Sequence, residues 1–177
     1  FEKRKDLITL VKAFHILKKN ESNKKLKLVL AGAKVFNGTY NVINEIDKYI
    51  KTHNLENEIL ILGYISDDLA DFNFKNAFIY AFPSTNEGFG IPIIEAFSYS
   101  LPVVCSDIPV FKEIGNEAVS FFKVNSYISL SEKLQKLVDS KTYRLKLINK
   151  GNNQLIKFSR KNFIQSFEDI IMKWDEK

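Results

Sequence analysis

The sequence contains little cysteine and histidine and no long apolar run. Its single cysteine, Cys105, excludes an internal disulfide and fits a reducing compartment; in an apolar stretch after Pro102 we interpret it as a small buried residue. His15 and His53 stand far apart without a third ligand, a pattern that does not predict a metal site. No run approaches the roughly 20 apolar residues that a membrane-spanning helix needs. These shortages argue against disulfide-stapled, histidine-metal and membrane-spanning classes.

Size and charge are those of an ordinary globular domain. A chain of 177 residues with 45% hydrophobic and 27% charged residues fits one domain. The net charge of +5 comes from lysines spread over most predicted helices, which indicates solvated helix faces and no nucleic-acid partner. Peripheral attachment to the inner face of a membrane is the alternative to a purely cytoplasmic location. Because the chain starts at Phe1 in a charged segment, we expect it to be a piece of a longer protein.

Strand-like apolar runs alternate with helical patterns along the whole chain. Such alternation predicts an α/β fold with a parallel sheet covered on both faces, in which ligands bind beyond the carboxyl ends of the strands. The expected strands are 26–32, 58–62, 77–82, 102–105 and 118–121. The expected helices are 6–17, 40–53, 66–76, 91–99, 126–140, 142–158 and 161–174, with a helical turn at 110–114 stopped by Gly115.

The segment 82–96 is predicted to form the end of a strand, a loop and the start of a helix. Pro83 ends the strand because it cannot donate to the ladder. Gly88 and Gly90 let the backbone turn sharply and approach a ligand closely. Free N–H groups at the start of a helix favour a phosphate or an electron-rich sugar oxygen. Glu95, about one turn into the helix, is placed to accept hydrogen bonds from a pair of hydroxyls.

Residues 80–114 resemble the donor-binding signature of retaining, nucleotide-sugar-dependent glycosyltransferases with the GT-B fold. The resemblance rests on Pro-Ser, Glu-Gly-Phe-Gly, Pro-Val-Val and Glu-Ile-Gly elements in that order, with Glu87 and Glu95 separated by seven residues. It implies that 1–177 is one Rossmann-like domain, the C-terminal, sugar-nucleotide-binding half of a GT-B fold. Residues 160–177 would form a terminal helix, and the first strand and the N-terminal acceptor domain would lie outside this sequence.

The resemblance also implies roles for charged residues. Lys5 would contact the donor diphosphate, with Arg4 as a weaker substitute for a second basic residue of the family. Glu87 would orient donor hydroxyls and support positive charge at the anomeric carbon. These cations lie just before a helix whose predicted N-cap is Asp6, an unfavourable place unless an anion is also present. The alternative interpretation of Lys5 is an exposed lysine at a helix start.

Further contacts implied by the resemblance involve the backbone. The segment Gly88, Phe89 and Gly90 would donate N–H groups to the diphosphate, and Tyr64 and Ile65 would lie beside the nucleobase. A simple surface aromatic is the alternative for Tyr64. Glu95 would hold the ribose hydroxyls of a uridine or guanosine donor, UDP- or GDP-linked.

The implied reaction is hexosyl transfer to an acceptor hydroxyl, with the acceptor a carbohydrate or a lipid-linked sugar held by the missing domain. No Asp-x-Asp motif is present, so we expect neither a metal nor a separate cofactor. This chain alone is expected to be inactive. Two alternatives are a nucleotide-sugar-binding module without activity and an epimerase on the same fold. A third, a dinucleotide-binding domain, lacks its Gly-x-Gly-x-x-Gly after the early strands.

Overall fold

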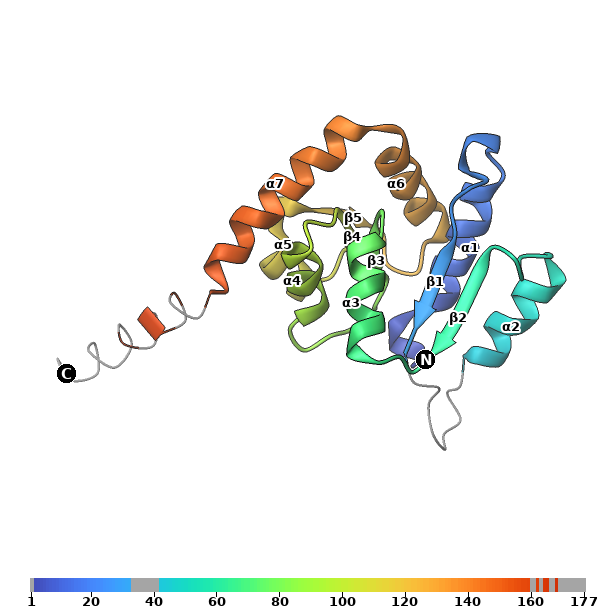
Figure 1. The fold of residues 1–177 in the computed structure, drawn as a ribbon, viewed down its shortest axis with the longest axis horizontal. Coiled ribbons are helices and arrows are strands. Elements are labelled where there is room, and N and C mark those ends of the chain that lie inside the picture. Colours follow the sequence, from blue (N-terminus) through green and yellow to red (C-terminus); the bar gives the residue numbers. More distant parts are fainter. Residues whose placement is uncertain (1, 33–41, 160–161, 163, 166–167, 169–177) are drawn as a thin grey trace.

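Strands and helices alternate as predicted in the computed structural model, which describes residues 2–32, 42–159, 162, 164–165 and 168 (Figure 1). The strands are β1 (Leu28–Ala31), β2 (Ile59–Gly63), β3 (Tyr80–Phe82), β4 (Val103–Ser106) and β5 (Val119–Phe122). The helices are α1 (Leu7–Lys18), α2 (Ile43–Thr52), α3 (Asp67–Asn76), α4 (Ile91–Ser98), α5 (Pro109–Gly115), α6 (Tyr127–Asp139) and α7 (Lys141–Lys157), with short 3-10 turns η1 (Lys3–Lys5), η2 (Glu21–Asn23) and η3 (Asn116–Ala118). The predicted α/β fold is confirmed; the terminal helix expected at 160–177 lies largely outside the described residues.

All strand pairs are parallel, but they form two sheets. β1 pairs with β2, and β3, β4 and β5 form a second sheet in that order. The predicted parallel pairing is confirmed, and the structure divides the strands into two sheets. Neither β1 nor β3 has a partner on its other edge in the described part of the chain. The pattern of apolar runs could not reveal this break, because pairing between strands is not local.

One apolar core nevertheless lies beneath both sheets. It includes Leu30 and Ile59 from the first sheet and Val104 and Phe122 from the second. The α1 helix joins them, because its apolar residues recur at helical spacing and are buried: Leu10, Val11, Phe14 and Leu17. This packing fixes the N-terminal end of α1 relative to β3 and the loop that follows it.

A second core holds α4 and α5 against the larger sheet. Phe97 of α4 and Phe111 of α5 are at most 1% exposed. Gly151 allows α7 to come close, since a Cβ there would lie 2.7 Å from Phe97 Cδ1. The α4 helix is therefore held by packing on two sides.

Helix ends follow the predicted chemistry in part. Ser66 accepts a hydrogen bond from Leu69 N–H at 3.3 Å, as expected of an N-cap. Asp6 stands at the predicted N-cap position of α1, with φ 45°, but its side chain makes no capping hydrogen bond. Gly115 does not end α5 by a left-handed turn, because the positive φ belongs to Asn116.

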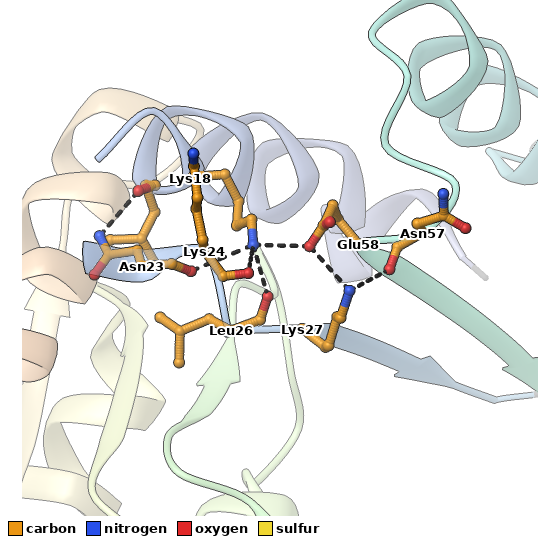
Figure 2. A network of polar contacts seen from close by, with 8 residues as sticks. Lys18, Asn23, Lys24, Leu26, Lys27, Asn57 and Glu58 are labelled. Carbon is orange, nitrogen blue, oxygen red and sulfur yellow. Dashed lines mark hydrogen bonds and ion pairs between the residues drawn. The ribbon is translucent and has the colours of Figure 1, made fainter. Parts of the chain in front are cut away.

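The ammonium group of Lys18, at the C-terminal end of α1, is shielded from solvent within a network of polar contacts (Figure 2). Lys18 Nζ lies 2.7 Å from Glu58 Oε2, and its side chain is 9% exposed. It also donates to the backbone carbonyls of Asn23, Lys24 and Leu26. Lys27 is a second cation on Glu58, at 3.2 Å, and hydrogen bonds from Lys18 and then Lys27 lower the pKa of that carboxyl group. The network ties the end of α1 to the entrances of β1 and β2.

The two histidines meet although they are far apart in the sequence. Their ring centroids are 4.8 Å apart, and His15 Nδ1 lies 3.0 Å from Tyr49 Oη. His53 stacks on the Tyr49 ring at 4.0 Å.

The described residues contain no group of three metal-ligating side chains. Every helix among them is too short or too polar to cross a bilayer.

We expect this cluster to make folding pH-dependent. Burial, followed by His53 and Lys19, lowers the pKa of His15, so the unfolded chain binds a proton more readily than the folded one. Stability should therefore fall as the pH drops below about 6.5, the ordinary pKa of histidine, and should stop falling once the pH lies below the pKa of His15 in the folded protein. Urea unfolding at about pH 7.5 and about pH 5 measures the change. His15→Gln should reduce it; an unchanged pH dependence in this variant would contradict the assignment.

Candidate functional site

The loop between β3 and α4 has the shape that its glycines predict. Gly90 is the N-cap of α4 with φ 99°, in the region that favours glycine, and a Cβ there would lie 3.3 Å from the Phe111 ring. Gly88 lacks a positive φ, and a Cβ there would meet no atom within 4 Å. Gly90 is therefore required by the fold, whereas Gly88 leaves open space beside the loop. Pro92 stands in the first turn of α4, as expected.

A cluster of charges joins this loop to the segment before α1. Lys5 Nζ lies 2.6 Å from Glu87 Oε1, and Arg4 Nη1 lies 2.7 Å from Glu87 Oε2. Glu87 is the best shielded of the three, with 12% of its side chain exposed against 31% for Lys5 and 42% for Arg4. The anion that the cations before α1 require is thus Glu87, which is 82 residues away from Lys5 in the sequence.

The ionisation of Glu87 is set by opposing effects. Burial alone would raise the pKa of the Glu87 carboxyl group. Hydrogen bonds from Lys5, the largest of the lowering effects, and from Arg4 lower it by more, so the pKa lies below its usual value. The carboxylate is charged at neutral pH as a result. A charged, shielded carboxylate between two cations is a feature of functional sites as well as of structural ion pairs.

Two residues that the sequence did not single out hold the basic segment in place. Thr85 binds the carbonyl of Arg4 twice, through its backbone N–H at 2.7 Å and its hydroxyl at 3.2 Å. Lys5 Nζ lies 5.2 Å from the centre of the Phe82 ring. No local sequence signal marks Thr85, because its partner is far away along the chain.

Both glutamates lie within electrostatic reach of Tyr80. Glu95 is exposed on α4. The pKa of the Tyr80 hydroxyl on β3 is raised mainly by burial, and then by the negative charges of Glu95 and Glu87. Both carboxylates therefore affect the same hydroxyl.

Phe89 is 48% exposed, and its ring lies 6.1 Å from that of Phe158.

The predicted base contacts are not joined to this cluster. Tyr64 and Ile65 directly follow β2, and Tyr64 is 84% exposed. Within the described residues no hydrogen bond, ion pair or ring contact links either of them to Arg4, Lys5 or Glu87. The structure therefore assembles the charged part of the predicted site and leaves the predicted base contacts open.

Residues 1–154 match the family described as glycosyl transferases group 1. The chain belongs to this family. It is 27% identical over 161 residues to the O-antigen chain mannosyltransferase B of Escherichia coli, covering 91% of this chain and 41% of that protein. It is 26% identical to the capsular polysaccharide biosynthesis glycosyltransferase CapM of Staphylococcus aureus, covering 95% of this chain and 43% of that one. The chain thus spans about two-fifths of the length of these relatives.

Solved structures with the same fold include other glycosyltransferases. The C-terminal domain of the group 1 family protein LpcC from Francisella tularensis superposes with a TM-score of 0.78 at 20% identity, covering 89% of this chain and 80% of that one. Anabaena Alr3699/HepE, solved in complex with UDP and glucose, has a TM-score of 0.78 at 19% identity, covering 100% of this chain and 46% of that one. At this identity the likeness concerns the fold. The prediction of a Rossmann-like domain that forms half of a GT-B fold is confirmed.

Proposed function

We propose that this domain of the glycosyltransferase binds a nucleoside diphosphate sugar, UDP- or GDP-linked, and that the complete enzyme transfers the sugar to an acceptor hydroxyl with retention and without a metal. The observation that carries the proposal is the meeting of Arg4, Lys5 and Glu87 beside the glycine loop at the start of α4. Breaking the anomeric bond leaves negative charge on the diphosphate. Two cations and the N–H groups of Gly88 to Gly90 stabilise such a charge in place of a metal.

The glutamates have separate roles in this proposal. Glu95, exposed on α4, accepts hydrogen bonds from the ribose hydroxyls. Glu87 orients donor hydroxyls and supports positive charge at the anomeric carbon. Tyr64 and Ile65 lie beside the nucleobase, and the exposure of Tyr64 leaves its ring available.

We also propose that the acceptor, a carbohydrate or lipid-linked sugar, is held by a second domain outside this sequence. The share of the relatives that the chain spans supports this. The free edges of β1 and β3 support a further strand between them, supplied by the longer protein. The complete enzyme would work in the cytoplasm or at the inner face of the membrane.

Titration calorimetry of this chain with UDP, GDP, ADP and their sugar conjugates tests the donor site. We expect one base to bind and Glu95→Ala to weaken its binding by about 1.5 kcal/mol, the lower end for a hydrogen bond to a charged group, because Glu95 is exposed. Glu132→Ala on α6 removes an exposed carboxylate elsewhere and should leave affinity unchanged.

Two results would count against this assignment. Equal losses of nucleotide affinity in Glu95→Ala and Glu132→Ala would show that Glu95 has no specific role in binding. Absence of binding by every nucleotide, repeated with the full-length protein, would overturn the donor site itself.

A further inference from the structure

The carboxylate of Glu87 occupies a position that a bound anion would also need. Each of its oxygens has one cation, Oε1 with Lys5 at 2.6 Å and Oε2 with Arg4 at 2.7 Å. Two oxygens of a phosphate group can meet two cations in the same way. Resting on the proposed function, we propose that Glu87 is the counter-ion of Arg4 and Lys5 whenever no donor is bound, and that the donor diphosphate displaces it.

The cations themselves are held independently of Glu87. Thr85 fixes the backbone of Arg4 through two hydrogen bonds to its carbonyl, at 2.7 Å and 3.2 Å, and the Arg4 guanidinium also donates to the Asn86 carbonyl at 3.4 Å. The ammonium of Lys5 lies 5.2 Å from the Phe82 ring centre. Glu87 precedes Gly88, around which there is open space. A diphosphate therefore finds both cations in place, and the group that moves aside is the Glu87 side chain.

The charges of this cluster are balanced. Glu2 pairs with Arg4 Nε at 2.5 Å, so two carboxylates face two cations. Glu2 has 50% of its side chain exposed, whereas Glu87 has 12%. Glu87 is thus the shielded competitor of an incoming anion, and its charge opposes binding of the diphosphate more than that of Glu2 does.

Competition between Glu87 and the diphosphate for Lys5 and Arg4 would weaken binding of the product. After the sugar has left, the product is a nucleoside diphosphate without the hydroxyls that Glu87 orients. The carboxylate then returns to Lys5 and Arg4 and opposes the product there. Glu87 would accordingly lower the affinity for the product relative to the sugar-bearing donor.

Neutralising Glu87 measures this competition directly. Glu87→Gln keeps the shape of the side chain and removes its charge, and we expect it to bind UDP or GDP about fivefold more tightly than the unchanged chain, the factor that a partly exposed ion pair represents. Inorganic pyrophosphate should gain by a similar factor. Glu2→Gln should show a smaller gain of the same sign, and Glu132→Gln on α6 none. Calorimetry gives the affinities, and thermal unfolding checks that each variant is folded.

The possible outcomes separate this inference from the proposed function. If the unchanged chain binds UDP or GDP and Glu87→Gln binds it equally or more weakly, Glu87 is not a competitor and the inference is overturned. If Glu87→Gln gains affinity for pyrophosphate while no nucleotide binds better than pyrophosphate, the counter-ion role stands and the nucleotide proposal fails. If neither nucleotides nor pyrophosphate bind to either form, both are overturned.

Discussion

Lys5→Met is expected to weaken UDP or GDP binding by about 2–3 kcal/mol, roughly 30- to 150-fold, while leaving the bare nucleoside almost unaffected. Lys5 Nζ already lies 2.6 Å from one carboxylate oxygen, so it is positioned to contact an anion without rearrangement. Methionine keeps much of the aliphatic chain that packs near Phe82 and removes only the charge. Calorimetry with the diphosphate and the nucleoside, side by side, measures the difference.

The neighbouring lysine is the matched control for this prediction. Lys3 stands in the same turn, η1, and is exposed. Lys3→Met changes the net charge by the same amount and should leave the affinity for the diphosphate nearly unchanged. Equal losses for nucleoside and diphosphate in Lys5→Met, or equal losses in both variants, would show that Lys5 is only a surface lysine at the start of a helix.

Gly90→Ala is expected to destabilise the domain by about 2–3 kcal/mol. A side chain at φ 99° is strained, which costs about 1–3 kcal/mol, and the new Cβ would press on the Phe111 ring at 3.3 Å. The ring is itself fully buried and has little room to move. Equilibrium unfolding in urea measures the loss.

Gly88→Ala is the contrasting variant in the same loop. A Cβ at Gly88 meets nothing within 4 Å, so the free energy of unfolding should change by less than about 0.5 kcal/mol. If the loop backbone approaches the diphosphate as proposed, this variant should instead lose nucleotide affinity several-fold. Similar stability losses in the two variants would contradict the separation between a glycine needed by the fold and one needed for a ligand.

Local features of the site could be predicted from the sequence because their causes lie in neighbouring residues. Proline and glycine at fixed positions dictated the strand, loop and helix around Gly90, and Ser66 marked the start of α3. The requirement for an anion near Lys5 followed from helix electrostatics. That Glu87 supplies this anion did not follow from the sequence, because the two segments meet only through tertiary packing of α1 against the core.

Contacts between distant segments account for what was missed. The division into one sheet of β1 and β2 and another of β3, β4 and β5 depends on which strands pair, and apolar runs in the sequence give no information on pairing. His15 and His53 meet because α1 and α2 pack side by side. α5 ends at Gly115 as expected, but the positive φ belongs to Asn116, and a Cβ at Gly115 would lie 2.8 Å from Val119, so the glycine allows close packing there.

The Lys18 network of Figure 2 lies at the entrances of β1 and β2, whereas Lys5 lies at the opposite end of α1. Removing the Lys18 ammonium would leave carbonyls and a carboxylate without their cation and so reduce the amount of folded protein, while removing that of Lys5 would change what the folded protein binds. In a cell both variants lose activity. Lys5 just before α1 and Lys18 at its end thus have effects that are indistinguishable in a growth assay and separable by comparing protein abundance with activity per folded molecule.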